Sequence, residues 1–474
     1  MNFEPVIGIE IHVELNTKSK MFSAAPVTFG KMPNSQTVQY DLSCPGTMPQ
    51  VNKEAVRDGI KIATALHMSI DKLVKFDRKN YFYPDLPKGY QITQQFHPIG
   101  SEGYLDLDID GKMVRIGVER AHLEEDTAKQ LHLGDMSLVD YNRAGTPLVE
   151  IVSKPDMRSG LEAMKYVEEI REIVTFLDVS DGKMENGSMR CDGNVSIRPV
   201  GSEKFGTKCE IKNLNSIANV RAAIDYEVKR QSELILSGQE VRQETRRYDE
   251  TNKCTVLMRV KNNAVDYKYF RDPNIVPIQL SDEFVKETQA SMNKLPWVYK
   301  QELLDKGLSK YETELLIANK AFVYYFNDCV DLGVKSLKTL WNYLLGDISA
   351  HLNKEMLTLE DLKFSKQDLV NLCDLVSDNK INSKQAKKVM ELMINDGADP
   401  LKVVKSLGLE QVSDPNAILA IVKDVLSKNE QSVTDYKNGK DKALGYIVGQ
   451  VMKASRGKAN PGMAKELVLK EIGE

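Results

Sequence analysis

Carboxylates and a histidine recur on the polar side of short alternating segments in the first half of the chain. In "VIGIEIHVEL" (residues 6–15) every second residue is aliphatic, and Glu10, His12 and Glu14 occupy the positions between them. Strict alternation is typical of a half-buried strand. Two carboxylates and an imidazole can bind a metal ion if other strands contribute, or they can belong to an ordinary solvated sheet face.

Three further segments repeat this pattern. "SMRCDGNVSIRP" (188–199) has Arg190 and Asp192 on its polar side, and "GTKCEIKNLNS" (206–216) has Lys208, Glu210 and Lys212. "VRIGVERAHLEEDTAK" (114–129) runs from a strand-like start into the cluster His122, Glu124, Glu125 and Asp126. An open antiparallel sheet would bring these polar sides together on one face.

Glu150 stands alone in the apolar run "TPLVEIVS" (146–153). A carboxylate in a buried strand is costly unless a cation meets it. One interpretation is a salt bridge to Arg143 or Arg190. The other is that Glu150 lies on the same polar face of the sheet as the acids at 10, 125, 192 and 210.

Acids and bases on one surface are what a metal–phosphate site requires. Mg²⁺ prefers oxygen ligands, and Lys and Arg neutralise phosphate oxygens. Arg190, Lys208 and Lys212 are therefore candidate phosphate-binding residues. The chain has no G-x-x-x-x-G-K-[ST] loop and no G-x-G-x-x-G opening a helix, so a nucleotide would bind on the sheet.

An aromatic and basic segment, "RKNYFYPDLPKGYQI" (78–92), lies between these strands. Its Pro and Gly residues rule out a regular helix. It is either a rigid surface loop or a clamp, in which Tyr81 and Tyr83 stack on a ligand and Lys79 and Lys88 bind phosphate. "DYKYFRDP" (266–273) has a similar composition.

The chain has 474 residues, 42% hydrophobic and 28% charged, which predicts a globular protein of two or three domains. Alternating segments mix with helical patterns at 54–68, 161–177 and 217–237 up to about residue 280, and Gly238 is a plausible helix end. Helical periodicity dominates beyond that point. We expect an α+β domain at 1–290, an all-helical domain at 291–408 and a small helical tail at 409–474.

Charge and motifs exclude several functions. The net charge of −4 argues against a generic nucleic-acid binder, although residues 401–474 hold 12 Lys and Arg against 9 Asp and Glu. No apolar run reaches membrane-spanning length, no signal peptide is visible and the six cysteines are scattered, so we expect a reduced, cytoplasmic protein. No amidase or glutaminase nucleophile motif is present, so the chain is not expected to release ammonia from an amide.

Seven motifs in order resemble the B subunit of the heterotrimeric aspartyl/glutamyl-tRNA amidotransferase. They are "IGIEIHVELNTKSKMF", "NYFYPDLPKGYQI", "HLEEDTAK", "DYNRAGTPLVEIVSKPD", "MRCDGNVSIR", "GTKCEIKNLNS" and "DYKYFRDP", and "GYIVGQVMKASRGKANPGMAKELV" resembles that family's YqeY-type tail. The resemblance implies an antiparallel-sheet cradle related to glutamine synthetase, followed by helical and tail domains.

The resemblance also implies a reaction. ATP would phosphorylate the side-chain carboxylate of mischarged Glu-tRNA(Gln) or Asp-tRNA(Asn), and ammonia from the amidase A subunit would then displace the phosphate. A small C subunit would hold the two larger subunits together. The tRNA acceptor end would enter the cradle, and the tRNA body would lie on the helical and tail domains.

The implied Mg²⁺ ligands are Glu10, His12, Glu125, Glu150 and Asp192, and Glu210 joins them as a catalytic residue. Imidazole is a less usual Mg²⁺ ligand, so His12 either binds a softer ion or orients a water. Many relatives carry a four-cysteine zinc site around residues 20–49, where this chain has only Cys44, so no zinc is expected. Lys453, Arg456 and Lys458 are expected to contact tRNA, unless they are only the solvated end of a helix.

Two other functions compete with this interpretation. A stand-alone ligase of the glutamine-synthetase type would act on a free amino acid, but it would not need the helical half and the tail. A non-catalytic RNA-binding scaffold gives no reason for the acids at 10, 150 and 192 to share one surface.

Overall fold

The computed structural model describes residues 2–260, 266–410, 415–455, 459 and 461–473. The chain divides into two compact units, Met1–Tyr299 and Lys300–Glu474. The expected domain boundary at residue 290 lies within the first unit. The predicted α+β class, with a mainly antiparallel sheet first and helices after it, is confirmed.

One large sheet organises the first unit. Its strand order is β14-β13-β12-β11-β1-β10-β7-β6-β2, and neighbours are antiparallel except for β12 and β13. In that order the strands are Cys254–Val260, Glu244–Asp249, Cys209–Lys212, Met189–Pro199, Phe3–Glu14, Pro147–Ser153, Lys112–Glu125, Gly100–Ile109 and Ser69–Ile70.

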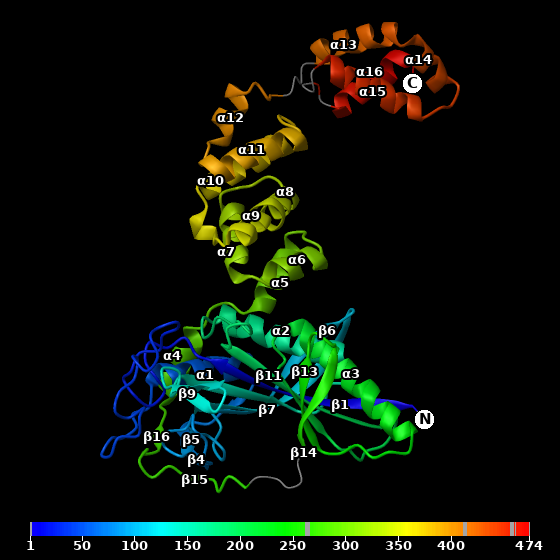
Figure 1. Cartoon of the computed structure of the whole chain (residues 1–474). Helices are drawn as coiled ribbons and strands as arrows, with labels where there is room; N and C mark the ends of the chain where they lie inside the picture. Colours follow the sequence, from blue (N-terminus) through cyan, green and yellow to red (C-terminus); the bar gives the residue numbers. More distant parts are fainter. Residues whose placement is uncertain (1, 261–265, 411–414, 456–458, 460, 474) are drawn as a thin grey trace. The chain divides into compact units, whose positions relative to one another are not determined.

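The alternation predicted for β1 is confirmed by burial. Ile7, Ile9, Ile11 and Val13 are fully buried, whereas Glu10, His12 and Glu14 are only partly buried. The aliphatic side contributes to a core shared with α1 (Lys53–Ala65), α2 (Gly160–Phe176) and α3 (Ile217–Leu236) (Figure 1). The bounds of these three helices agree with the predicted helical segments to within a few residues. Gly238, which follows α3, has a φ of +78°, as expected where a helix ends in a left-handed residue.

Three small sheets complete the first unit. The order β15-β4-β5 joins Phe270–Arg271, Asp77–Asn80 and Tyr90–Thr93, so it unites the two aromatic segments of the sequence. Strand β16 (Ile278–Gln279) pairs with β3 (Leu73–Val74), and β8 (Lys129–Leu133) pairs with β9 (Met136–Asp140). Helix α4 (Asp282–Ala290) follows, and α5 (Pro296–Asp305) leads into the second unit.

The named elements in the described part of the second unit are helical. They are α6 Lys310–Ile317, α7 Lys320–Asp331, α8 Leu337–Asn342, the π-helix η1 Tyr343–Ile348, α9 Ser349–Glu355, the 3₁₀ helix η2 Leu359–Asp361, α10 Lys366–Ser377, α11 Ser383–Asp396, α12 Pro400–Ser406, α13 Pro415–Lys428, α14 Glu430–Lys437, α15 Lys442–Ala454 and α16 Pro461–Ile472. Helices α13–α16 share a hydrophobic cluster that includes Ile418, Val422, Ile447 and Val451.

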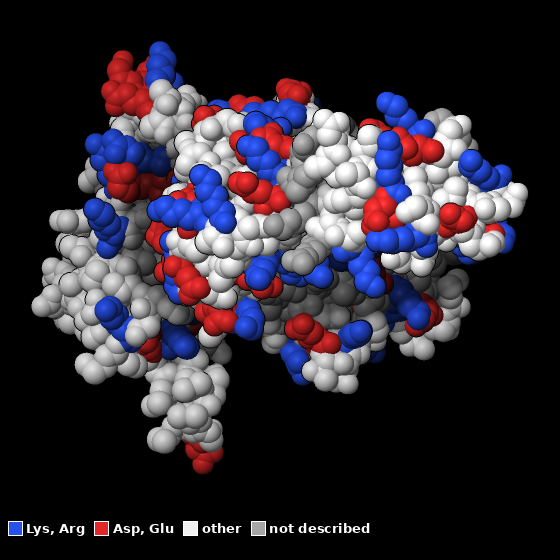
Figure 2. All heavy atoms as spheres, turned by 90° about the horizontal axis from the view of Figure 1, so that it is seen from above, with Lys and Arg blue, Asp and Glu red and all other residues white. Residues whose placement is uncertain are grey.

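Surface charge gives no large field of one sign on the face shown in Figure 2, where Lys and Arg are interspersed with Asp and Glu. Across the described ranges, none of the helices is long and apolar enough to cross a membrane.

Candidate active site

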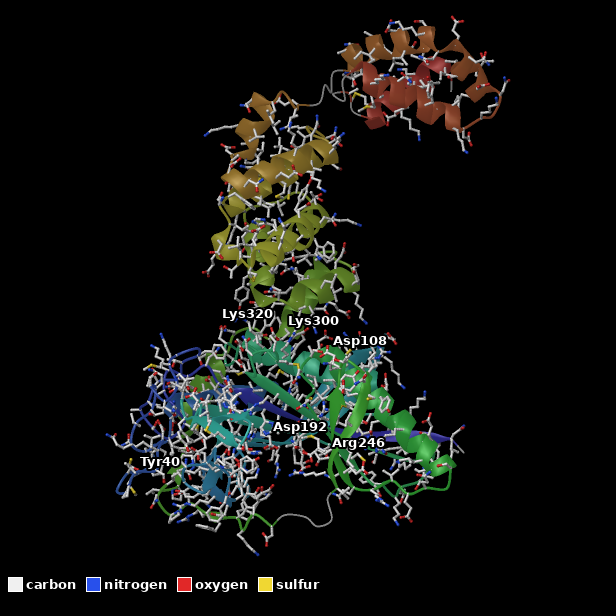
Figure 3. The ribbon with its side chains drawn as sticks, viewed as in Figure 1. Tyr40, Asp108, Asp192, Arg246, Lys300 and Lys320 are labelled. Carbon is white, nitrogen blue, oxygen red and sulfur yellow. The ribbon has the colours of Figure 1, made fainter. Side chains whose placement is uncertain are left out.

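The strand register aligns the polar sides of the middle strands. Glu10 of β1 lies opposite Val152 of β10 on one side and Asp192 of β11 on the other. His12, two residues further along β1, lies opposite Glu150 and Arg190. Because residues two apart share a face, these side chains form one surface on the side of the sheet away from the helical core. Figure 3 labels Asp192 within this sheet.

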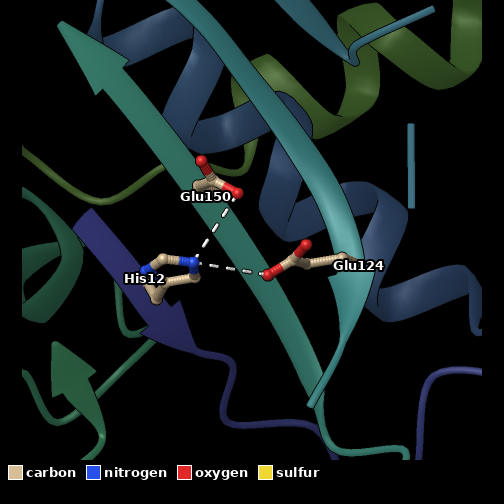
Figure 4. A group of neighbouring side chains, drawn as sticks. All are labelled: His12, Glu124 and Glu150. Atoms are coloured by element: carbon tan, nitrogen blue, oxygen red, sulfur yellow. Dashed lines mark ion pairs between the residues drawn. The ribbon is translucent and has the colours of Figure 1, made fainter. Parts of the chain in front are cut away.

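His12, Glu124 and Glu150 converge on this surface from β1, β7 and β10 (Figure 4). His12 Nε2 lies 3.6 Å from Glu150 Oε2 and 3.7 Å from Glu124 Oε1, and one ligand atom of each residue lies within 4.8 Å of the others. Ligands of an octahedral Mg²⁺ ion at about 2.1 Å are about 3 Å apart, so small side-chain movements would complete such a shell. The donor set fits a divalent cation.

His122 lies directly beside these carboxylates. Its Nε2 is 3.1 Å from Glu150 Oε2 and 3.7 Å from Glu124 Oε2. Burial alone would lower the pKa of His122, but the charges of Glu150 and Glu124 outweigh burial and raise this pKa to about 9. Burial would likewise raise the pKa of Glu150, yet His122, His12 and Lys79 hold it well below its usual range. The raised pKa of His122 and the lowered pKa of Glu150 favour an imidazolium–carboxylate pair between these two residues.

A second acidic group lies across β1, β11 and β12. Lys212 Nζ is 2.6 Å from Asp192 Oδ2 and 3.1 Å from Glu210 Oε1. Glu10 accepts a hydrogen bond from Asn194 Nδ2 at 2.8 Å. The pKa of Glu10 is raised, first by burial and then by Glu150, with smaller contributions from Asp192 and Glu210 that together outweigh the Asn194 hydrogen bond. One lysine thus faces several carboxylates, and a bound cation would relieve their repulsion.

Glu125, the expected ligand, does not belong to either group. Its carboxylate accepts hydrogen bonds from Lys88 Nζ at 2.8 Å and from the backbone N–H of Ile92 at 2.9 Å. Strand β7 continues through Glu125, so alternation directs Glu124 rather than Glu125 toward His12. Lys88, expected to bind phosphate, is paired with Glu125 instead.

His122 and Glu124 belong to the cluster seen in the sequence, but only Glu125 of that cluster is among the expected ligands. The signal that separates them is the alternation of β7, which places His122 and Glu124 on one face at a spacing of two. The expected alternative for Glu150, a salt bridge to Arg143 or Arg190, is also wrong. Arg190 Nη2 and Arg143 Nε lie 2.6 Å and 3.5 Å from Asp126 Oδ2.

The aromatic clamp is only partly assembled around the acids. Lys79 Nζ lies 5.0 Å from the ring centre of Tyr267 and 6.0 Å from that of Tyr81. Burial alone would lower the pKa of Lys79, but Glu124, Tyr269 and Glu150 raise it, which places Lys79 near the carboxylates. Tyr83 is 55% exposed and makes none of the ring contacts found in the described ranges.

A cavity of about 330 Å³ adjoins Glu10. Its lining includes the apolar residues Val6, Val152, Pro155 and Phe205, and the charged residues Glu10, Glu119 and Lys208. The expected phosphate ligand Lys208 thus lies at the cavity next to the acidic surface. Apolar walls with a few charged groups are typical of small-ligand sites.

The three residues expected to contact tRNA are only partly described. Lys453 lies in the last turn of α15. Arg456 and Lys458 lie outside the described residues.

Comparisons with known proteins cover almost the whole chain. A family model described as "GatB/GatE catalytic domain" matches residues 5–286, and one described as "GatB domain" matches residues 324–472. The B subunit of the aspartyl/glutamyl-tRNA(Asn/Gln) amidotransferase of Geobacillus kaustophilus is 49% identical over 476 residues, covering all of both chains. The protein of the same name from Bacillus velezensis is 48% identical over 474 residues, covering 100% of this chain and 99% of the relative.

Proposed function

This chain belongs to the family of aspartyl/glutamyl-tRNA(Asn/Gln) amidotransferase B subunits, and we propose that it activates the side-chain carboxylate of mischarged tRNA with ATP. The substrates are Glu-tRNA(Gln), Asp-tRNA(Asn) or both. Ammonia then displaces the phosphate and yields the amide. Because the proposed reaction serves translation, we expect the chain to act in the cytoplasm.

The convergence of His12, Glu124 and Glu150 is the observation that carries this proposal. A carboxylate is a poor electrophile at neutral pH, so amide formation requires its conversion into an acyl phosphate. These three residues would hold one Mg²⁺ ion, and Glu10, Asp192 and Glu210 provide the oxygens for another. A bound divalent ion supplies charge stabilisation to phosphoryl oxygens.

The chain's own residues organise the rest of the site. His122 balances the charge of Glu150 and Glu124 and holds their carboxylates in place. The cavity beside Glu10 is large enough for the base and sugar of ATP, with Phe205 and Pro155 as apolar walls and Lys208 for phosphate. Lys212 lies between Asp192 and Glu210, where it limits the repulsion between them.

Partner proteins complete the reaction. The chain lacks a nucleophile motif for releasing ammonia, so an amidase A subunit supplies it and a small C subunit joins the two. The acceptor end of tRNA enters the sheet domain, and the helical and tail domains bind the tRNA body. With Cys44 as the one cysteine between residues 20 and 49, metal analysis of the purified protein is expected to find no stoichiometric zinc.

The test is reconstitution of the chain with its amidase and small partner subunits, mischarged tRNA, ATP and glutamine, followed by measurement of amide and ADP. Wild type is expected to form both in equal amounts, and Glu150→Gln neither. Glu283→Gln, an exposed change on α4, is the matched control and should retain full activity. Amidation of free glutamate without tRNA would favour a stand-alone ligase. Binding of tRNA without ADP formation would favour a scaffold.

A further inference from the structure

Arg120 lies on the same face of β7 as His122 and Glu124. Its backbone is opposite Val152 of β10, which in turn is opposite Glu10 of β1. His122 lies in the neighbouring row, opposite Glu150 and then His12. Because side chains two residues apart on a strand are about 7 Å apart, Arg120 borders the acidic surface.

Arg120 has no carboxylate partner among the residues that the structure describes. Its Nε atom is buried and makes no hydrogen bond. The other arginines of β7 and β11 each have a carboxylate partner, since Arg115 binds Asp106, Arg190 binds Asp126 and Arg198 binds Glu4. A buried donor without a partner is costly, so its retention requires a reason.

The surroundings of Arg120 favour a ligand as that reason. Burial raises the pKa of the Tyr269 hydroxyl. Lys79, Glu150 and Arg120 also affect this pKa, so the hydroxyl lies close to all three. The hydroxyl therefore remains a neutral donor. Two further buried nitrogens on this face also lack partners, His122 Nδ1 and Arg190 Nε. Unused donors thus gather beside the carboxylates.

We propose that Arg120 is a substrate-binding residue that holds an oxyanion of a reactant beside the His12, Glu124 and Glu150 cluster. This inference rests on the proposed function, in which two reactants carry such a group. They are ATP, through its terminal phosphate, and the mischarged tRNA, through its side-chain carboxylate. The planar guanidinium matches either group with paired hydrogen bonds. An arginine that was only solvated would have its Nε in water rather than buried.

The experiment measures binding to the complete complex with two matched ligand pairs. The first pair is a non-hydrolysable ATP analogue and ADP, which lacks the terminal phosphate. The second is mischarged Glu-tRNA(Gln) and its amidated product, which lacks the carboxylate. Arg120→Met is expected to weaken binding of the oxyanion-bearing member of one pair about 10- to 100-fold and leave its counterpart unchanged. The affected pair identifies the oxyanion.

Arg115→Met is the control, because Arg115 lies on the same strand but is exposed and paired with Asp106. This change should leave unchanged the preference for the oxyanion-bearing member in both ligand pairs. If Arg120→Met does not fold, Arg120→Lys replaces it and is expected to weaken the same preference several-fold, since an ammonium lacks the paired geometry. A folded Arg120 variant that retains both preferences would overturn the inference. Failure of wild type to form amide from ATP would instead reject the proposed function.

Discussion

Glu124 and Glu125 are neighbours on β7, but their carboxylates have different partners. Glu124 Oε1 lies 3.7 Å from His12 Nε2, whereas Glu125 accepts a hydrogen bond from Lys88 at 2.8 Å. Strand alternation accounts for this division. One carboxylate is available to the candidate metal site, and the other joins β7 to the aromatic segment.

Replacement of the two glutamates separately should reveal this difference. Glu124→Gln is expected to lower the rate of ATP-dependent amidation about 100-fold or more, because the proposed ion site would lose a charged ligand that the amide cannot replace. Glu125→Gln removes the charged partner of the buried Lys88. It should mainly lower the free energy of unfolding, by about 3 kcal/mol. Amidation rate and thermal melting of both variants provide the measurement. Equal loss of activity without destabilisation would contradict the assignment.

Glu10→Gln should weaken Mg²⁺ binding rather than lower the stability of the fold. The pKa of Glu10 is raised by burial and by neighbouring acids, so the neutral side chain costs little stability. Loss of one charge from this group is expected to raise the Mg²⁺ concentration required for half-maximal amidation about tenfold. Glutaminase activity of the amidase partner should be unchanged. An unaltered Mg²⁺ titration would remove Glu10 from the ion site.

Glu227 is expected to make the stability of the fold depend on pH in the acid range. It is fully buried and accepts hydrogen bonds from Arg230 and Gln231 of the same helix and from Thr255, whose bond joins α3 to β14. Burial alone would raise its pKa, but Arg230 and Gln231 lower it below the ordinary 4.5. Because the folded pKa lies below the unfolded one, Glu227 stabilises the fold above about pH 4.5, and this contribution falls as the pH drops below that value.

Glu227→Gln should therefore cost about 3 kcal/mol at pH 7 and flatten the acid limb of the stability curve. Glu233→Gln, an exposed change on the same helix, should cost less than about 0.5 kcal/mol. Urea unfolding at several pH values measures both. A parallel pH curve for Glu227→Gln and wild type would show that the network carries no pH dependence.

Deletion of residues 412–474 should affect tRNA binding rather than chemistry. The tail has its own hydrophobic cluster, and residues 401–474 have more basic than acidic groups. The affinity that phosphate contacts provide falls steeply as the salt concentration rises. The deletion should therefore raise the KM for mischarged tRNA and make this KM less dependent on salt. Amidation with free ammonia at saturating tRNA should persist. An unchanged KM would exclude the tail from the binding surface, and a lost kcat would mean that the tail positions the acceptor end.

The alternation of β1 and β11 could be predicted because a period of two assigns every side chain to a face. The partners of Glu150 could not be predicted from it, since they depend on which strands are neighbours and in what register. The structure brings His122 and Glu124 from β7, a strand distant in sequence, to one side of Glu150. The resemblance implied Glu125 as a ligand, whereas the alternation of β7, which extends through Glu125, directs Glu124 toward His12.

The central claim is that ATP phosphorylates the substrate carboxylate at this site, and oxygen transfer tests it most directly. Mischarged tRNA carrying ¹⁸O in the side-chain carboxylate would be amidated by the complete complex with ATP and ammonia, and the released phosphate analysed by mass spectrometry. The account predicts one ¹⁸O atom in phosphate for each amide formed. Stoichiometric amide formation with phosphate free of ¹⁸O would contradict it.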